Sequence, residues 1–414
     1  MGFFTGYRCS VCGQEYGPDE VTYTCLKDGG NLDVILDYDS LKAGWKISDL
    51  TLRAEPSLWR YQPLLPVGDP WADGTPLRAA GWTPHFRVEG LASQIGLERL
   101  WIKDESRNPT ASFKDRASAV VVTRAREIGA QVVVTASTGN AGAALAGMAA
   151  AVGQRAVILA PRTAPPAKVA QLLVYGAEVL LVEGTYDEAF DLSVQVADEF
   201  GWYCRNTGYN PFTAEGKKTA SFEIWENILL PRYYGRRPLS IFVSVGDGNI
   251  ISGMHKGFVD LQRMGWLETM PRLYGVQAAG SAAVANAFKA GTDTIVPVKA
   301  STLADSISVD LPRDGYRALR AVRETGGSYI TVEDTEILTA ITRLGKIGIF
   351  AEPAGSTAFA GLVKAVGEGL VQADDPVVVM VTGSGLKDVG AAREAAGEAP
   401  VIEPTLQAVL KHFK

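Results

Sequence analysis

A buried strand that ends in a glycine-containing turn occurs three times in this chain. The strands are expected at residues 132–135, 241–245 and 377–381, and the turns follow at 137–142, 246–249 and 382–385. The first two turns lead into helices. Because backbone N–H groups at a helix start point outward at the positive end of the macrodipole, such turns bind anions. We expect a carboxylate at the first turn and a phosphate at the second.

Strands and helices alternate along most of the chain, which predicts an α/β fold with parallel-rich sheets flanked by helices. The expected strands lie near residues 131–135, 156–160, 179–182 and 202–205, and a second set lies near 241–245, 272–277, 328–332 and 377–381. A helix at 88–95 and a strand at 100–103 precede them. Residues 41–84, rich in Trp, Pro and Gly, indicate an irregular wrap with a helix or two. The tail after residue 400 is expected to pack as a helix.

Lys114 is the candidate catalytic residue. It follows the small and turn-forming residues 108–112 and stands just ahead of a long apolar helical run. A lysine that is partly desolvated there can lose its proton, and a neutral amine can form a Schiff base with an aldehyde cofactor. A surface lysine at a helix start is the alternative for this stretch taken alone.

Composition excludes several classes of protein. The chain has 414 residues, 47% of them hydrophobic, which is enough for two or three domains, and its net charge of −6 argues against nucleic acid as the main partner. Its three histidines are isolated in sequence, which leaves little material for a histidine metal site or a serine-histidine triad. No leader or membrane-spanning run is evident, so we expect a cytoplasmic protein that acts on small molecules.

Four residues near the N-terminus have the spacing of a small zinc-ribbon-like module. Cys9 and Cys12 form one knuckle, and Cys25 and Asp28 form the other, each followed by glycine. Three thiolates and a carboxylate can bind zinc, but a metal-free remnant held by packing is also compatible with the pattern. A disulfide is the third alternative, and Cys204 is expected in the core.

These elements, in this order, resemble the fold-type II pyridoxal-phosphate enzymes, and their sequence motifs are closest to those of the threonine synthase group. Further matching stretches lie at residues 215–219, 275–278, 304–307, 351–355 and 382–387. The resemblance implies a two-lobed, tryptophan synthase β-like fold and a homodimer. It divides the chain into an N-terminal ribbon at 1–40, a large domain at 41–116 and 213–414, and a small mobile domain at 117–212.

The resemblance also carries roles to matching positions. Lys114 would hold pyridoxal 5′-phosphate and move protons at the substrate. The other expected cofactor contacts are Phe113 against the ring, Asn140 at the 3′-hydroxyl, Gly246, Asp247, Gly248 and Asn249 around the phosphate, and Thr382 at the ring nitrogen. Ser137, Thr138, Gly139 and Asn140 would surround the substrate carboxylate. A neutral hydroxyl at Thr382 favours elimination and replacement over transamination.

The substrate pocket departs from the threonine synthase pattern. Ala141 and Thr213 stand where the family often has a threonine and an arginine that grip the substrate phosphate. Arg205, Lys217 and Lys218 are candidate substitutes, and of these we expect Lys218 to bind the substrate. Asp247 also places a negative charge in a cofactor loop that is one residue shorter than in the family.

We therefore expect elimination and replacement on an activated amino acid, with O-phosphohomoserine to threonine as the leading reaction. The first alternative is β-replacement on an O-activated serine or threonine, as in the cysteate synthase and cystathionine β-synthase groups. Dehydration of serine or threonine is another, and a binding protein without chemistry is a further one. A nicotinamide site is disfavoured because Gly246-x-Gly248 lacks a third glycine at the Rossmann spacing.

Overall fold

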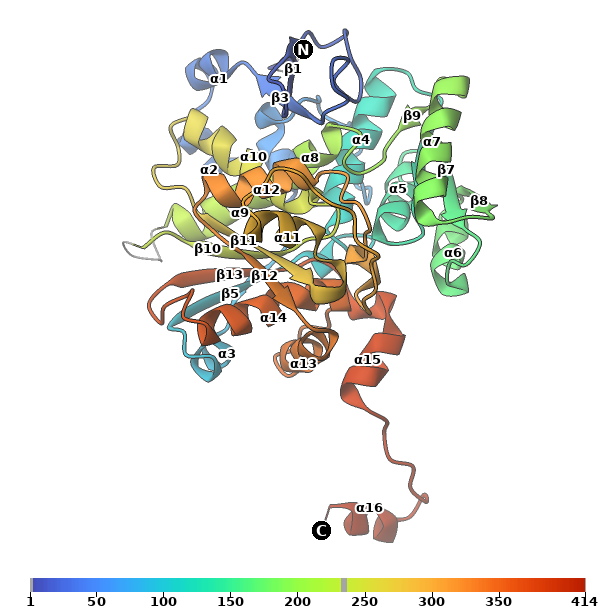
Figure 1. Ribbon diagram of the computed structural model, residues 1–414, viewed down its shortest axis with the longest axis vertical. Helices are drawn as coiled ribbons and strands as arrows, with labels where there is room; N and C mark the ends of the chain where they lie inside the picture. The colour runs from blue at the N-terminus through green and yellow to red at the C-terminus, as the bar shows by residue number, and fades with distance from the viewer. Residues whose placement is uncertain (1–2, 232–236, 414) are drawn as a thin grey trace.

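Three β-sheets organise the chain, which the computed structural model describes over residues 3–231 and 237–413 (Figure 1). The largest has six strands in the order β12-β11-β10-β13-β5-β4. Its strands are β4 (His85–Arg87), β5 (Arg99–Asp104), β10 (Ser240–Ser244), β11 (Arg272–Ala278), β12 (Tyr329–Val332) and β13 (Pro376–Val381). All neighbours pair in parallel except β4 with β5. The strands expected in this region are confirmed, and β4 was not foreseen.

A four-stranded, fully parallel sheet forms the second lobe, in the order β8-β7-β6-β9. Its strands are β6 (Val132–Ala136), β7 (Arg155–Pro161), β8 (Glu178–Val182) and β9 (Tyr203–Cys204). The four strands expected here are therefore confirmed. A three-stranded antiparallel sheet at the N-terminus consists of β1 (Phe4–Cys9), β2 (Glu15–Tyr16) and β3 (Leu32–Leu36).

Helices cover both faces of the large sheet, as the burial of every residue of β13 requires. Val377, Val379 and Val381 pack in one hydrophobic core, against α14 (Pro353–Gly367) and α13 (Asp334–Gly345). Val378 and Met380 point the other way, into the core that includes α10 (Asn249–Arg263) and α12 (Gly315–Glu324). A strand with apolar side chains on both faces must be covered on both faces. The predicted α/β class is confirmed.

The remaining helices connect and flank the sheets. They are α1 (Tyr38–Gly44), α2 (Ile47–Thr51), α3 (Glu89–Gln94), α4 (Lys114–Glu127), α5 (Asn140–Ala150), α6 (Pro166–Val174), α7 (Tyr186–Phe200), α8 (Phe212–Lys217), α9 (Thr219–Ile224), α11 (Ala283–Lys289), α15 (Val389–Ala396) and α16 (Leu406–His412). Over residues 3–231 and 237–413, none is long and apolar enough to cross a membrane.

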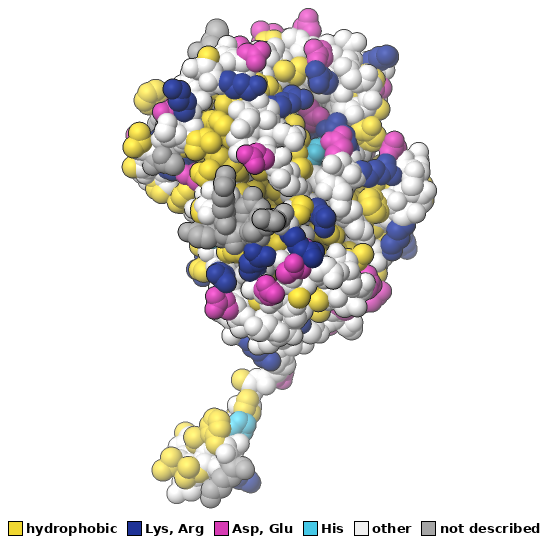
Figure 2. Space-filling view, turned by 90° about the vertical axis from the view of Figure 1, so that its left-hand side faces the viewer, with side chains coloured by type: hydrophobic (Ala, Val, Ile, Leu, Met, Phe, Trp, Pro, Cys, Tyr) yellow, Lys and Arg dark blue, Asp and Glu magenta, His cyan; other side chains and the backbone are white. Residues whose placement is uncertain are grey.

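The C-terminal tail forms a helix, as predicted, but it does not pack. Figures 1 and 2 show α16 away from the rest of the chain, and none of its residues is buried. Val401 and Phe413 are 98% and 82% exposed. The prediction of a packed tail is wrong, because the seven-residue helix meets no complementary surface on its own chain.

A buried ion network fixes the start of α4 against the rest of the large lobe. Arg116 pairs with Glu105 at 2.7 Å and with Glu223 at 2.5 Å, and Lys103 pairs with Glu223 at 2.6 Å. All four side chains are almost completely buried. Because each buried charge has a partner of opposite sign, the network avoids the cost of an isolated ion. It holds residue 114, two positions before Arg116, in a defined place.

Removal of one carboxylate from this network should reveal the energetic cost of a buried charge without a partner. We predict that Glu223→Gln, which leaves Arg116 and Lys103 short of a carboxylate, lowers the free energy of unfolding by about 3–5 kcal/mol. Glu178→Gln is the matched control, because Glu178 and Arg155 form an ion pair whose side chains are 57% and 62% exposed. That control should cost at most about 1 kcal/mol. Denaturant midpoints measure both, and equal midpoints would contradict the role assigned to the network.

Candidate active site

Lys114 is the first residue of α4 and is held at the carboxyl end of β13. The Phe113 amide N–H donates to the Thr382 carbonyl at 2.9 Å, and Ser112 forms a β-bridge with Gly383. The preceding turn places Ala111 at φ +65°, a left-handed conformation that is costly for a residue with a side chain. Local backbone strain at Ala111 therefore accompanies the turn that brings Lys114 to the edge of the large sheet.

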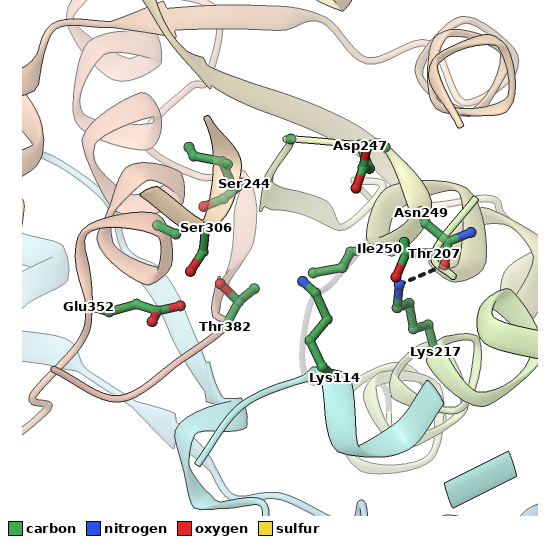
Figure 3. Close-up of a pocket in the computed structure, with 14 residues that line it drawn as sticks. Lys114, Thr207, Lys217, Ser244, Asp247, Asn249, Ile250, Ser306, Glu352 and Thr382 are labelled. Atoms are coloured by element: carbon green, nitrogen blue, oxygen red, sulfur yellow. Dashed lines mark hydrogen bonds between the residues drawn. The ribbon is translucent and has the colours of Figure 1, made fainter. Parts of the chain in front are cut away.

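The Lys114 side chain enters a cavity between the two lobes (Figure 3). Among the described residues, none forms a hydrogen bond or an ion pair with its amine. Burial lowers the pKa of Lys114, and the Arg205 charge acts in the same direction, whereas Glu352 and Asp247 oppose it. A lysine in this setting has a larger neutral, nucleophilic fraction than one on the surface.

The loop at 246–249, the expected phosphate cradle, faces Lys114 at the start of α10. Gly246, Asp247, Gly248 and Asn249 all line the cavity. Gly248 has φ +93°, and a Cβ there would lie 2.7 Å from the Cβ of Ala318. The backbone conformation and this close approach require glycine at position 248. The N-terminal N–H groups of the 15-residue helix that follows face the cavity.

Lys217 supplies a positive charge beside this cradle. Its Nζ donates to Asn249 Oδ1 at 2.6 Å, and the Asn249 amide donates to Asp314 Oδ2 at 2.7 Å. The side chain is fully buried, and burial together with the Lys114 and Arg205 charges lowers its pKa. No described carboxylate forms an ion pair with it. A phosphate at the cradle would neutralise this charge.

The start of α5 forms the wall on the side of the smaller lobe. Ser137, Thr138, Gly139 and Asn140 line a neighbouring cavity, which shares Lys114, Thr207, Asp247 and Ser306 with the first. The Asn140 amide donates to Glu352 Oε1 at 2.7 Å and to Ser306 Oγ at 3.4 Å. The residues expected around a carboxylate are therefore next to the lysine.

Thr382 and Glu352 line the cavity on the side of the large lobe. Figure 3 shows both side chains across the cavity from Asp247 and Lys217. Burial raises the pKa of the Glu352 carboxyl, an effect that Lys387 and Lys114 oppose. No role was assigned to Glu352 from the sequence, although it lies in one of the matching stretches. The sequence feature that could have identified Glu352 is an acidic residue directly before the proline that begins α14.

Three residues singled out from the sequence do not line either cavity. Lys218 is buried in ion pairs with Glu215 and with Asp260, the latter at 2.7 Å. Phe113 is fully buried, and its ring lies 5.6 Å from the Arg116 guanidinium carbon. Thr213 donates its hydroxyl to the Asn210 carbonyl at 2.7 Å. Lys217 takes the cavity position that the sequence gave to Lys218.

The cavity fits pyridoxal phosphate by its own chemistry. It offers an amine without a partner, two crowded glycines at a helix start, and a buried cation beside them.

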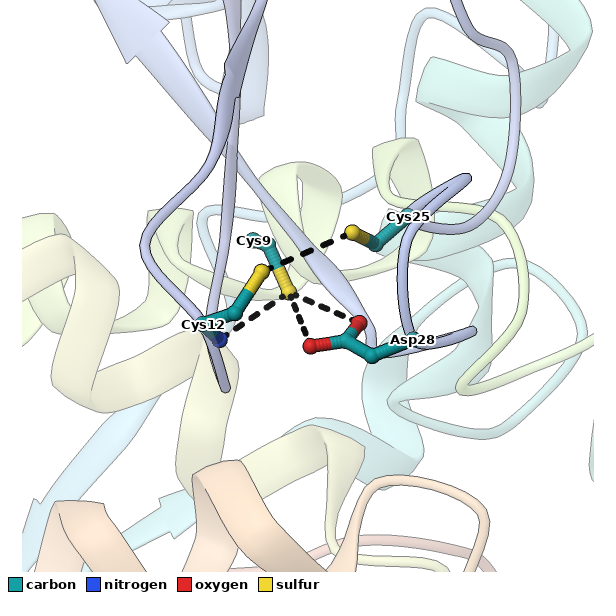
Figure 4. A group of neighbouring side chains, drawn as sticks. All are labelled: Cys9, Cys12, Cys25 and Asp28. Atoms are coloured by element: carbon teal, nitrogen blue, oxygen red, sulfur yellow. Dashed lines mark hydrogen bonds between the residues drawn. The ribbon is translucent and has the colours of Figure 1, made fainter.

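The four N-terminal ligand candidates also come together (Figure 4). One ligand atom from each of Cys9, Cys12, Cys25 and Asp28 lies within 4.8 Å of all the others. The Sγ atoms of Cys12 and Cys25 are 3.7 Å apart, and Cys9 Sγ lies 3.3 Å from Asp28 Oδ1. Tetrahedral zinc with ordinary bond lengths places two sulfurs about 3.8 Å apart and a sulfur and an oxygen about 3.6 Å apart. All four cysteines of the chain are free, so the disulfide alternative is wrong.

Comparison with known proteins gives three consistent results. The family profile "Pyridoxal-phosphate dependent enzyme" matches residues 77–383. A curated threonine synthase from Methanocaldococcus jannaschii is 38% identical over 411 residues, which cover 98% of this chain and 99% of that protein. One from Methanosarcina acetivorans is 38% identical over 407 residues, 97% of each chain.

Solved structures share the fold. A diaminopropionate ammonia lyase from Escherichia coli superposes with a TM-score of 0.65 at 21% identity, covering 76% of this chain and 87% of that chain. The threonine deaminase isoform 2 from Solanum lycopersicum gives 0.63 at 23% identity, covering 76% and 83%. At these identities the similarity establishes the architecture alone.

The setting of Lys114 makes a prediction about reactivity. Because burial lowers the pKa of Lys114 from the usual 10.5, its amine in cofactor-free protein should become reactive at a lower pH than a surface lysine. Competitive acylation followed by peptide mass spectrometry measures this, with exposed Lys411 as the internal reference. A reactivity midpoint for Lys114 at or above that of Lys411 would contradict the assignment.

Proposed function

This chain belongs to the threonine synthase family of pyridoxal-phosphate-dependent enzymes, and we propose that it converts O-phosphohomoserine and water into threonine and phosphate. The observation that carries the proposal is the 38% identity to a curated threonine synthase over 98% of this chain and 99% of that protein.

The cofactor would be held by residues that meet at the cavity. Lys114 would carry it, the loop 246–249 with Lys217 would bind its phosphate, and Thr382 would face its ring nitrogen. Asn140, which donates to Glu352 at 2.7 Å, would turn toward the 3′-hydroxyl. When bound, the cofactor supplies an electron sink for negative charge at the substrate α-carbon.

The protein's own groups orient the substrate and move its protons. The start of α5 presents Ser137, Thr138 and Gly139, and its N–H groups would bind the α-carboxylate. The amine of Lys114 lines the same cavity and, in its neutral form, can accept a proton from the substrate α-carbon. Lys114 can then return protons to neighbouring carbons as phosphate leaves and water adds.

A neutral hydroxyl at Thr382 supports this class of reaction. The carboxylate nearest to the cavity on that side, Glu352, has a raised pKa because it is buried. Without an ionised carboxylate at the ring nitrogen, the nitrogen stays largely unprotonated, which favours elimination and replacement over transamination.

Turnover tests the proposal directly. Incubated with O-phosphohomoserine, the holoenzyme should release phosphate and threonine in equal amounts. Lys114→Ala should lower the rate at least about 10²-fold, because proton transfer by a placed side chain contributes that much or more. Absence of both products would overturn the proposal. Reaction instead of O-activated serine with a thiol, or release of ammonia from serine or threonine, would establish one of the alternatives.

We also propose that Cys9, Cys12, Cys25 and Asp28 bind zinc. The distances among their ligand atoms suit a tetrahedral ion. Backbone N–H groups of Val11 and Cys12 approach Cys9 Sγ at 3.4 and 3.5 Å, and the Gly30 N–H donates to Asp28 Oδ1 at 2.9 Å. Such donors orient metal ligands and offset the charge of thiolates.

Elemental analysis of protein purified without chelators tests the zinc proposal. We expect one zinc per chain, with a loss of most of it in Cys12→Ala and in Cys25→Ala. Cys204→Ala is the matched control, because Cys204 lies buried in the smaller lobe and is not part of the cluster. Protein without zinc, or zinc that persists in both cluster variants, would contradict the proposal.

Domain boundaries, subunit number and location follow from the resemblance and are proposals as well. We propose a ribbon at 1–40, a large domain at 41–116 and 213–414, and a small mobile domain at 117–212. In support, each of the three sheets falls within one of these divisions. We further propose that the protein is a homodimer in the cytoplasm. Light scattering would measure the mass of the assembly.

A further inference from the structure

Arg205 differs from the other buried arginines in having no carboxylate partner. The described part of the chain buries Arg60, Arg116, Arg205 and Arg317. Arg60 pairs with Glu226 at 2.5 Å, Arg116 with Glu105 at 2.7 Å, and Arg317 with Asp314 at 2.5 Å. No described carboxylate lies within ion-pair distance of Arg205.

The contacts of Arg205 leave part of its guanidinium free. Nε donates to Ser118 Oγ at 3.1 Å, and Nη1 donates to Thr207 Oγ1 at 2.6 Å. Nη2 is buried and has no acceptor among the described residues. Two neutral hydroxyls do not balance a full positive charge, and an unpaired buried ion is costly. This geometry suits the binding of an anion.

The free guanidinium belongs to the wall of the candidate active site. The Arg205 N–H donates to the Val134 carbonyl at 2.8 Å, which places the residue at the carboxyl end of β9 beside β6. It lines the cavity that also holds Lys114, Thr207 and the start of α5. An anion bound by Arg205 would therefore share the cavity with the reacting amine.

The two buried cations without carboxylates serve different parts of the cavity. Lys217 is tied to Asn249 in the cradle expected to hold the cofactor phosphate. Arg205 lies on the smaller lobe, where Ala141 offers no polar side chain. Thr213 cannot help, because its hydroxyl already donates to Asn210. A second dianion in the cavity would therefore find its ligand in Arg205.

We propose that Arg205, together with Thr207, binds the phosphate group of the substrate and thereby selects a phosphorylated amino acid. This inference rests on the proposed threonine synthase activity. The planar guanidinium already donates to Thr207 through Nη1, and its free Nη2 can donate to a phosphate oxygen. Arg205 would also stabilise the phosphate as it leaves the substrate γ-carbon and takes up the electron pair of the broken C–O bond.

Asp247 lines the same cavity and must be reconciled with a bound phosphate. Its Oδ1 accepts the Arg313 backbone N–H at 3.3 Å, which draws the carboxyl toward the loop. Burial raises the pKa of Asp247, although Arg313, Lys217 and Lys114 oppose the shift. In its protonated form the carboxyl donates a hydrogen bond to a phosphate oxygen and does not repel it.

The test compares Arg205→Gln and Arg205→Lys with the native holoenzyme. For Arg205→Gln we expect KM for O-phosphohomoserine and the inhibition constant of inorganic phosphate to rise about tenfold or more, since a hydrogen bond to a charged group is lost. Arg205→Lys should recover part of both losses, because lysine keeps the positive charge but lacks the planar set of N–H donors of a guanidinium. Arg155→Gln removes an exposed charge from the same lobe and should change neither constant.

Two further readouts separate phosphate binding from other roles. The affinity for L-threonine, followed by the change in cofactor absorbance, should stay the same in Arg205→Gln, because threonine has a carboxylate but no phosphate. The affinity for the cofactor should also stay the same. An equal loss of threonine affinity would make Arg205 a carboxylate ligand, and loss of the cofactor would make it a structural residue. Either outcome overturns the inference, as does an unchanged inhibition constant of phosphate.

Failure of this inference can be told apart from failure of the proposed function. If native enzyme makes threonine and Arg205→Gln does so with unchanged KM, the function stands and the inference is wrong. If native enzyme makes no threonine but inorganic phosphate perturbs the cofactor absorbance in an Arg205-dependent way, the anion site stands and the reaction is wrong.

Discussion

Three basic side chains, Lys114, Lys217 and Arg205, line two adjoining cavities, and no carboxylate among the described residues is ion-paired to any of them. Elsewhere in the core the rule is the opposite: Lys103 and Arg116 share buried carboxylates. Basic side chains that lack carboxylate partners make the cavities that they line suited to anionic occupants. Cofactor phosphate and substrate phosphate are the two anions that the proposed reaction brings.

The arrangement of the sheets explains why these residues meet. Parallel strands place their carboxyl ends at one edge, and loops at such edges are where open α/β sheets bind ligands. In the large sheet β10 and β13 are neighbours, which brings the cradle at 246–249 close to Thr382. In the smaller sheet β6 and β9 are neighbours, which brings Ser137 close to Arg205. The cavity lies where these two edges face each other, with Lys114 at the start of the helix between them.

Features encoded by short stretches of sequence were predictable, and features that depend on rotation or long-range contact were not. The strands, the loop at 246–249 and Lys114 follow from apolar runs and glycine turns. Lys217 and Lys218 are adjacent in sequence, but a helix separates neighbours by about 100°, so one reaches the cavity and the other pairs with Asp260. Glu352 belongs to a matching stretch, yet its place opposite Lys114 depends on sheet packing. That Arg205 lacks a carboxylate partner became evident only from the structure, in which every other buried arginine among the described residues has one.

Reductive trapping tests directly whether Lys114 carries the cofactor in this cavity. Reduction of the holoenzyme with borohydride fixes the cofactor to its lysine, and digestion followed by mass spectrometry identifies the modified peptide. We expect the added mass on Lys114 and on no other lysine. The same mass on Lys217, or on no peptide at all, would show that Lys114 does not carry the cofactor.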